Sequence, residues 1–106
     1  MKVLVIGAAG MIGQKLLPHL AKDDVVAHDI VMPKVLPGMK ALVSDLSVPG
    51  EAEKLLSGKP EVIFHLAAIV SGEAEADFDK GYRINLDGTR LLFEAIRKSG
   101  LKPRVV

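Results

Sequence analysis

The chain has 106 residues, of which 49% are hydrophobic and 25% charged, and its formal net charge is +1. This length suits one domain, and so small a net charge argues against nucleic acid or an anionic membrane as a partner. The absence of cysteine excludes disulfides and thiolate metal sites, and His19, His28 and His65 are too far apart for a zinc motif. The longest apolar run, Val62 to Val70, is too short to cross a bilayer. The sequence therefore predicts a single cytoplasmic domain over residues 1–106, with no metal site.

A glycine-rich turn stands near the start of the chain. Gly7, Gly10 and Gly13 follow an apolar strand predicted over Lys2 to Ile6 and lead into a helical pattern. A helix in this setting directs its free backbone N–H groups and the positive end of its dipole at a phosphate. We assign Gly7 to the tight turn, Gly10 to close approach by phosphate and Gly13 to close packing of helix and strand. The alternative is a plain strand-to-helix connection that happens to use glycine.

The first helix is predicted over about Met11 to Lys22. Its first residues, Met11 and Ile12, lie between the glycines and are included in the predicted phosphate site. Pro18 interrupts the pattern, because an interior proline removes one backbone hydrogen bond and costs about 3 kcal/mol. The apolar periodicity continues to Leu20, so the sequence favours a kink over an early end.

The second predicted strand, Val25 to Val31, carries Asp29 near its carboxyl end. An acidic residue about 20 positions beyond such a glycine turn accepts hydrogen bonds from the ribose hydroxyls of a dinucleotide. Its charge would repel a 2′-phosphate, so Asp29 favours NAD over NADP. The alternative is a solvated carboxylate at a strand end.

A connection over Met32 to Met39 leads to a short third strand, Lys40 to Ser44, and then to Asp45 and Leu46. The next helix is predicted from Pro49 to about Gly58, where a glycine C-cap is expected. From the residues alone, Asp45 is as well suited to cap this helix as to bind a ligand. Ser47 competes for the capping role.

The remaining pattern continues the alternation of strands and helices. A fourth strand is predicted over Glu61 to Leu66, a long helix over about Ala76 to Ser99 with Gly100 closing it, and the start of a fifth strand over Lys102 to Val106. The fold expected is α/β: a Rossmann-like, doubly wound parallel sheet of strand order 3-2-1-4 with part of a fifth strand. A nucleotide would lie at the carboxyl ends of strands one and four. We interpret His65 as a packed strand residue rather than a catalyst.

Several stretches together resemble the extended, epimerase/dehydratase-like branch of the short-chain dehydrogenase/reductase superfamily. The spacing of the glycine triplet is typical of that superfamily, because Ala9 stands where the common dinucleotide fingerprint has its second glycine. The other stretches are the pair Asp45-Leu46, the strand-four ending His65-Leu66-Ala67-Ala68, and Asn85-Leu86-Asp87-Gly88-Thr89. The resemblance implies NAD as the cofactor.

The resemblance also implies roles for individual residues. Asp45 would accept the exocyclic amine of the adenine while Leu46 covers the face of the ring. Asn85 would support the active-site strand and helix, and Gly88 would permit close helix packing. Three further residues would lie at the cofactor ribose and pyrophosphate: Leu66, Ala67 and Ala68.

A narrower likeness and an absence concern the reaction. The run from Ile69 to Asp79 looks like the sugar-acid dehydrogenases of this branch, the D-erythronate dehydrogenase type. In the family, a serine or threonine follows strand five, and a tyrosine and a lysine four residues apart follow on the next helix. The single tyrosine here, Tyr82, has Leu86 four residues on. We therefore assign no catalytic residue to this chain, which is expected to be the first part of a family member.

Two hypotheses remain open. In the first, the chain is the NAD-binding part of an oxidoreductase or epimerase that acts on a sugar or sugar acid. In the second, it is a truncated or engineered half-fold that self-associates and binds nucleotide weakly or not at all. A helix face containing Tyr82, Leu86 and Phe93 predicts a homodimer or larger assembly through the 76–99 helix, or through the sheet edge. A flavodoxin-like carrier would not explain the glycine turn followed by Asp29.

Overall fold

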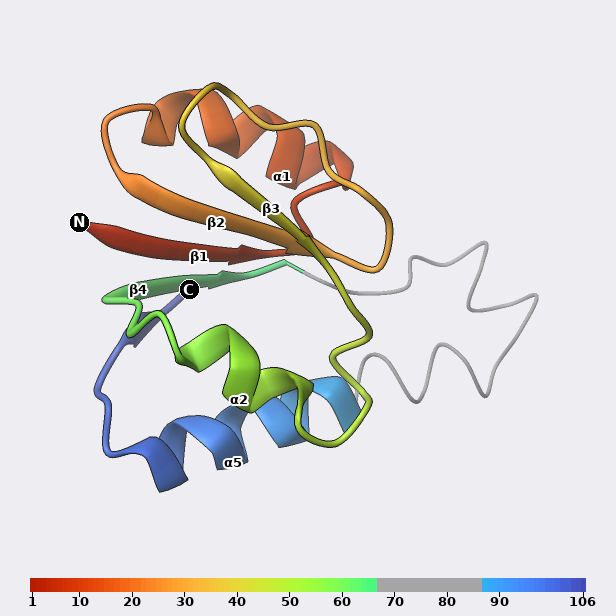
Figure 1. Ribbon diagram of the computed structural model, residues 1–106, viewed down its shortest axis with the longest axis vertical. Helices are drawn as coiled ribbons and strands as arrows, with labels where there is room; N and C mark the ends of the chain where they lie inside the picture. Colours follow the sequence, from red (N-terminus) through yellow and green to blue (C-terminus); the bar gives the residue numbers. More distant parts are fainter. Residues whose placement is uncertain (67–86) are drawn as a thin grey trace.

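The computed structural model describes residues 1–66 and 87–106, and these form one parallel sheet with helices on both faces (Figure 1). The strands are β1 (Lys2–Ile6), β2 (Asp24–Asp29), β3 (Lys40–Val43), β4 (Val62–His65) and β5 (Arg104–Val105). The helices are α1 (Met11–Leu16), the 3-10 helix η1 (Leu17–Leu20), α2 (Glu51–Leu56) and α5 (Thr89–Ser99). The strand order β3-β2-β1-β4-β5 confirms the predicted Rossmann-like arrangement, with the fifth strand paired to β4.

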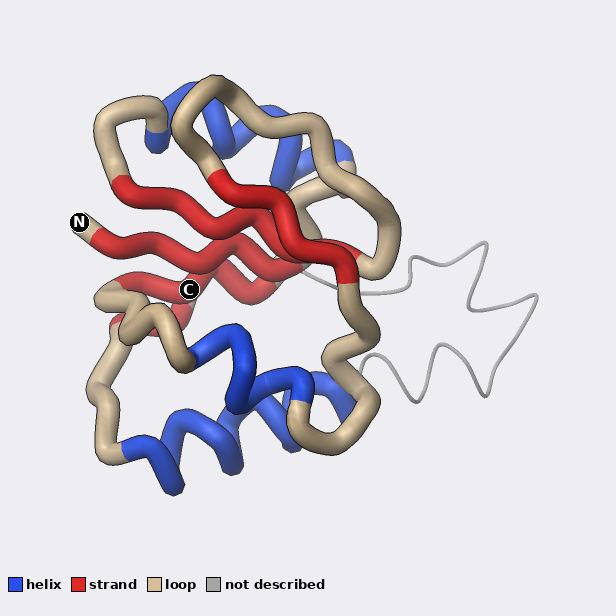
Figure 2. Tube along the Cα trace, in the orientation of Figure 1, coloured by secondary structure: helices blue, strands red, loops and turns tan. Residues whose placement is uncertain are grey.

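Each face of the sheet carries its own hydrophobic core, because successive side chains of a strand point to opposite faces. Leu4 and Ile6 of β1 pack with α2 and α5 on one face, whereas Val3 and Val5 pack with Leu17 on the other. Figure 2 shows the two helical layers on either side of the strands. Cover on both faces accounts for the uninterrupted apolar run of β1.

The first helix differs from the prediction at Pro18. The α-helix ends at Leu16 and the chain continues as η1 to Leu20, instead of running as one kinked α-helix to Lys22. Pro18 lies in the first turn of η1, where its missing N–H and fixed φ are tolerated. The apolar periodicity persists because Leu17 and Leu20 still pack on the sheet.

The strand β2 ends at Asp29, two residues earlier than the predicted Val31. The Ile30 N–H donates to the carboxylate of Asp29 at 2.6 Å, so this donor does not extend the ladder between strands. Ile30, Val31 and Met32 are exposed by 43, 59 and 68%. The prediction there was wrong because an apolar sequence pattern continues past the end of the strand.

The helix α2 starts at Glu51 after Gly50, not at Pro49 as predicted, and it has no side-chain cap. Asp45 instead accepts the N–H and the hydroxyl of Ser47 at 2.9 and 2.6 Å, within the loop that precedes the helix. The helix ends at Leu56, close to the predicted end, but its C-cap is Ser57 and not the glycine expected there. The capping roles considered for Asp45 and Ser47 are therefore not found.

The helix α5 ends at Ser99 with Gly100 as its left-handed C-cap, as predicted. Its predicted start near Ala76 lies outside the described residues. The inward face consists of Gly88, Leu92 and Ala95. Leu91 is only partly buried. Phe93 is 48% exposed, so this helix presents an aromatic side chain to solvent.

Candidate nucleotide-binding site

The glycine turn follows β1 and is fixed to the end of β2 by backbone hydrogen bonds. The N–H groups of Gly7 and Ala8 both donate to the His28 carbonyl, at 2.8 and 3.0 Å. Gly7 has a φ of 93°, a left-handed conformation that glycine adopts without the strain a side chain would bring. The turn is thus a defined structure that joins two neighbouring strands.

Gly13 lies closer to this turn than any other residue type would allow. A Cβ on Gly13 would lie 2.4 Å from the Gly7 carbonyl oxygen and 2.7 Å from the Cα of Ala8. Both contacts are with backbone atoms, which cannot rotate away as a side chain does. The first turn of α1 therefore packs directly on the glycine turn.

Among the described residues, packing does not explain the glycine at position 10. Gly10 has extended backbone, and a Cβ there would lie 3.4 Å from the Gly7 oxygen, at the limit of ordinary contact. Its assignment to phosphate approach stays a prediction. Met11 and Ile12 follow it at the start of α1, with side chains 75 and 68% exposed. Apolar surface therefore lies beside the turn.

Asp29 lies beside the glycine turn, although 20 residues separate it from Ala9 in the sequence. Its Oδ2 accepts the Ala9 N–H at 2.9 Å, and its Oδ1 accepts the Ile30 N–H. The carboxylate therefore holds the turn and the end of β2 together. The structure brings the predicted ribose ligand and the predicted phosphate turn to the same edge of the sheet.

The pair that follows β3 is divided between the surface loop and the core. Asp45 is bonded to Ser47, as described above. Leu46 is only 7% exposed and belongs to the core formed with α2 and α5. A Cβ on Gly88 would lie 3.7 Å from the Leu46 side chain, an ordinary contact, so among the described residues the close packing expected at Gly88 is not found.

The remaining predicted site residues lie around the end of β4. Leu66 is partly buried against the core on the α1 face, and its N–H donates to the Ile6 carbonyl at 2.8 Å. Ala67, Ala68 and Asn85 lie outside the described residues. Their predicted contacts with a cofactor stay predictions.

Two histidines flank Ile6 at the carboxyl ends of β2 and β4. Nε2 of His28 lies 2.7 Å from Ser44 Oγ, and Nε2 of His65 lies 2.8 Å from Thr89 Oγ1. The Nδ1 atoms of both rings have no hydrogen-bond partner among the residues the structure describes. Burial lowers the pKa of His28 and of His65 below the ordinary value of 6.5. Both rings fit a packing role on the α2–α5 face, as interpreted for His65 from the sequence.

Sequence reasoning missed Gln14. Its Nε2 donates to the Ala8 carbonyl at 2.8 Å and to the Lys34 carbonyl at 3.1 Å. The available signal was a polar residue directly after Gly13, but the sequence does not indicate which main-chain carbonyls such a side chain reaches. Gln14 links the glycine turn to the connection between β2 and β3.

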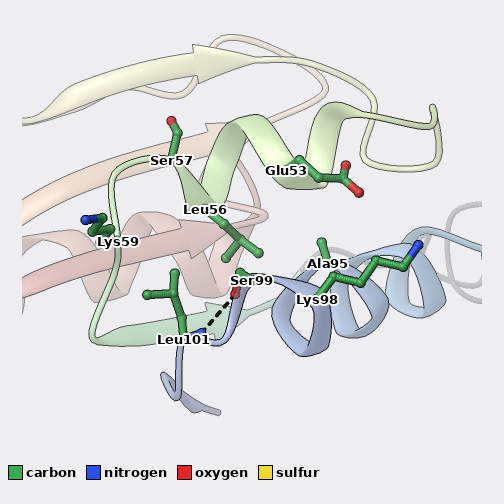
Figure 3. Close-up of a pocket in the computed structure, with 8 residues that line it drawn as sticks. All are labelled: Glu53, Leu56, Ser57, Lys59, Ala95, Lys98, Ser99 and Leu101. Carbon is green, nitrogen blue, oxygen red and sulfur yellow. Dashed lines mark hydrogen bonds between the residues drawn. The ribbon is translucent and has the colours of Figure 1, made fainter.

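A cavity of about 350 Å³ lies between α2 and α5 (Figure 3). Leu56, Ala95 and Leu101 supply much of its apolar lining, and the side chains of Lys59 and Lys98 also line it. Its lining includes Lys59 and Leu101, each three residues before the start of β4 or β5, so it lies toward the amino ends of these strands. None of the predicted cofactor-binding residues that the structure describes lines this cavity, and those of the glycine turn are among them.

The chain matches the model of the NAD dependent epimerase/dehydratase family over residues 3–106. The chain belongs to this family. The match confirms the resemblance drawn from the glycine triplet, the Asp45-Leu46 pair and the end of the fourth strand. Residues 1–66 and 87–106 contain no group of three or more histidine, cysteine, aspartate or glutamate side chains placed so that they could hold a metal ion. No helix in these ranges is long and apolar enough to cross a membrane.

Relatives in this family cover the chain almost completely. The D-erythronate dehydrogenase of Cupriavidus necator is 37% identical over 121 aligned residues, which cover 100% of this chain and 37% of that enzyme. The nucleoside-diphosphate-sugar epimerase from Agrobacterium tumefaciens has a solved structure that is 54% identical, with a TM-score of 0.88 over 99% of this chain and 36% of that one. A UDP-glucose 4-epimerase from Thermus thermophilus, solved in complex with NAD, is 29% identical, with a TM-score of 0.83 over 96% of this chain and 35% of that one. The chain therefore spans little more than a third of the length of these relatives.

Proposed function

We propose that this chain binds the adenosine diphosphate half of NAD and is the coenzyme-binding part of an oxidoreductase or epimerase that acts on a sugar or a sugar acid. The observation that carries the proposal is the 2.9 Å hydrogen bond from the Ala9 N–H to the Asp29 carboxylate. It joins a carboxylate suited to ribose hydroxyls to a turn suited to phosphate. The family and the NAD complex of the T. thermophilus relative support NAD as the coenzyme.

The glycine turn is the proposed site of the pyrophosphate. Gly7 and Gly13 shape the turn, and Gly10 leaves room for a phosphate because it has no Cβ. The backbone N–H groups of Met11 and Ile12 are at the start of α1, where the helix leaves such donors without intrahelical partners. The residues present therefore fit an anion at this position.

Asp29 is the proposed ligand of the adenosine ribose. A carboxylate accepts hydrogen bonds from the two ribose hydroxyls and is repelled by a 2′-phosphate. The Ala9 and Ile30 N–H groups already hold the carboxylate in place. This arrangement supports NAD in preference to NADP.

The proposed contacts with the adenine, and with the parts of the coenzyme beyond the glycine turn, are made by residues whose roles the family resemblance implies. Asp45 lies at the end of β3, on the β2 side of the site. The deep burial of Leu46 leaves only 7% of its surface free to contact a ring. The other residues proposed here are Leu66, Ala67, Ala68 and Asn85.

Bound NAD would supply a hydride acceptor for a sugar or sugar-acid carbon in the whole enzyme. The residues of this chain bind and orient the coenzyme, and the sequence lacks a tyrosine followed four residues later by a lysine. We therefore expect no dehydrogenase or epimerase turnover from the 106-residue chain. Absorbance of the reduced coenzyme, followed with a panel of sugar acids, tests this. Turnover that disappears on substitution of Tyr82 or His65 would contradict it.

Calorimetric titration with NAD, NADP and ADP tests the binding proposal. The expected order places NADP last, and Asp29→Asn should reduce the preference for NAD over NADP by about fivefold to tenfold, because it removes one charge–charge repulsion. Asp24→Asn is the matched control, since Asp24 is exposed at the opposite end of the same strand. Equal affinity of the unmutated chain for NAD and NADP would contradict the role of Asp29.

Self-association through α5 is a further part of the proposal. Phe93 is 48% exposed on this helix, and the two other residues of the predicted face, Tyr82 and Leu86, lie outside the described residues. Covering an exposed aromatic side chain with a second copy of the chain removes apolar surface from water, which favours association. A homodimer through the α5 face follows, with the sheet edge as the alternative surface.

A further inference from the structure

We propose that Gln14 is a positioning residue of the nucleotide site. Its side-chain amide holds the start of the β2–β3 connection against the glycine turn, and this closure contributes to the preference for a ribose without a 2′-phosphate. The inference rests on the proposed function for its effect on binding.

The amide of Gln14 donates to two carbonyls. Nε2 lies 2.8 Å from the Ala8 oxygen and 3.1 Å from the Lys34 oxygen. Both partners are acceptors only, so the NH₂ group and not the amide oxygen must face them. One side chain thus joins two main-chain segments that are 26 residues apart in the sequence.

The first partner is a fixed point. Ala8 is fully buried, and its N–H donates to the His28 carbonyl at 3.0 Å. The backbone contact of Gly13 with Gly7 and Ala8 places the first turn of α1 against the same residue. The backbone of Gln14, directly after Gly13, is therefore held firmly against the glycine turn.

The second partner belongs to a segment with exposed side chains. Ile30, Val31 and Met32 are all exposed, whereas Val35 and Met39 pack on the α1-side core. The connection follows α1 on its way from β2 to β3 (Figure 1). Pro33, directly before Lys34, is also buried. Gln14 therefore adds a polar contact beside the first apolar anchor of the connection.

Both ends of this exposed segment are tied to the glycine turn. At one end, Asp29 accepts the Ala9 N–H at 2.9 Å. At the other, Lys34 is held to Ala8 through Gln14. Residues 30–33 thus form a short loop closed at both ends beside the carboxylate proposed to bind the ribose. We infer that this loop borders the 2′-position of the ribose held by Asp29, so that a 2′-phosphate would require the loop to shift and an unmodified ribose would not.

Limited proteolysis without nucleotide tests the closure. Gln14→Met keeps the length of the side chain and removes both donors, and His19→Met is the control at an exposed polar residue of η1. Trypsin cleavage after Lys34 should rise at least about fivefold in Gln14→Met, the factor expected for one lost hydrogen bond. Cleavage after Lys54 should not change, which separates local opening from loss of stability.

Nucleotide titration of the same variants tests the effect on binding. The ratio of the NADP to the NAD dissociation constant should fall about fivefold in Gln14→Met and stay unchanged in His19→Met. A uniform loss of stability would not change this ratio. Gln14→Leu, which also lacks the donors and adds no charge, replaces Gln14→Met if that variant does not fold.

The outcomes are distinguishable. Unchanged cleavage after Lys34 in a folded Gln14 variant overturns the inference. An unchanged affinity ratio in a chain that binds NAD overturns the positioning role alone and leaves the proposed function standing. If the unmutated chain binds no NAD, the proposed function falls, and the positioning role falls with it.

Discussion

The two sides of the sheet use glycine in different ways. On the α1 side, a Cβ on Gly13 would lie 2.4 Å from the backbone oxygen of Gly7, whereas on the α5 side a Cβ on Gly88 would lie 3.7 Å from the side chain of Leu46. Only the first distance excludes a larger residue. Backbone-to-backbone contact is thus found at the turn proposed to hold the coenzyme, while the α5 side packs side chain on side chain.

Polar groups differ between the two sides in the same sense. On the α1 side, main-chain N–H groups and the Asp29 carboxylate meet at the edge of the sheet. On the α5 side, His28 and His65 each pair with one hydroxyl within a mainly apolar layer. We infer that the first side is arranged for an anionic ligand and that the second contributes chiefly to stability.

The largest expected effect is that of Gly13→Ala. The new methyl group cannot fit without a shift of the turn or of α1, so the free energy of unfolding should fall by about 2–3 kcal/mol. Gly10→Ala is the matched control, and because its contact is 3.4 Å it should cost less than about 1 kcal/mol. Urea unfolding of both variants measures the difference. Equal losses would mean that the two glycines do not differ as the distances indicate.

Much of the α1 side could be predicted from the sequence. The apolar run of β1, the glycine spacing and the position of Asp29 are local features, and parallel strands bring their carboxyl ends to one edge. The ends of the elements could not be predicted as well. The α-helix stops before Pro18, and β2 stops where the Ile30 N–H turns to the Asp29 carboxylate.

The partners of single side chains were beyond sequence reasoning. The resemblance assigned Leu46 to an adenine ring, yet its burial depends on where α2 and α5 pack. Gln14 reaches the Lys34 carbonyl only because the β2–β3 connection follows α1. Such contacts depend on how distant segments of the chain pack together, and this packing cannot be deduced from the pattern of residue types.

A second prediction tests the stability role of the α5 side through pH. Burial lowers the pKa of His28 and of His65, so as pH falls through about 6.5 the unfolded chain takes up protons before the folded chain does. Stability from the neutral rings is therefore fully present above this pH and is lost below it. Urea unfolding at several values between about pH 8 and pH 5.5 should show a fall in the free energy of unfolding. In a double variant with His28→Leu and His65→Leu, this free energy should fall less over the same interval. An equal loss in both proteins would contradict the stability role.

A third prediction concerns the outer face of α5. Phe93→Glu should raise the dissociation constant for self-association by at least about tenfold, because a charge would be buried at the contact. Lys98→Gln, at an exposed position about 140° around the helix from Phe93, is the control, because it lowers the net charge by the same amount away from this face. Light scattering at tens of micromolar measures both variants. A strictly monomeric unmutated chain would rule out self-association through this face.

The smallest expected effect is a gain in stability from Gly88→Ala. Gly88 has right-handed helical backbone, with φ −61° and ψ −45°, which alanine adopts without strain. Replacing glycine at such a position reduces the conformational freedom of the unfolded chain and should raise the free energy of unfolding by about 0.5 kcal/mol. The new methyl group would also make an ordinary contact with Leu46. Paired with Gly13→Ala, this variant applies the same substitution on both sides of the sheet, and the two changes should have opposite signs in urea unfolding. A loss of more than about 1 kcal/mol in Gly88→Ala would show that α5 packs as closely as the glycine turn and would remove the contrast between the two sides.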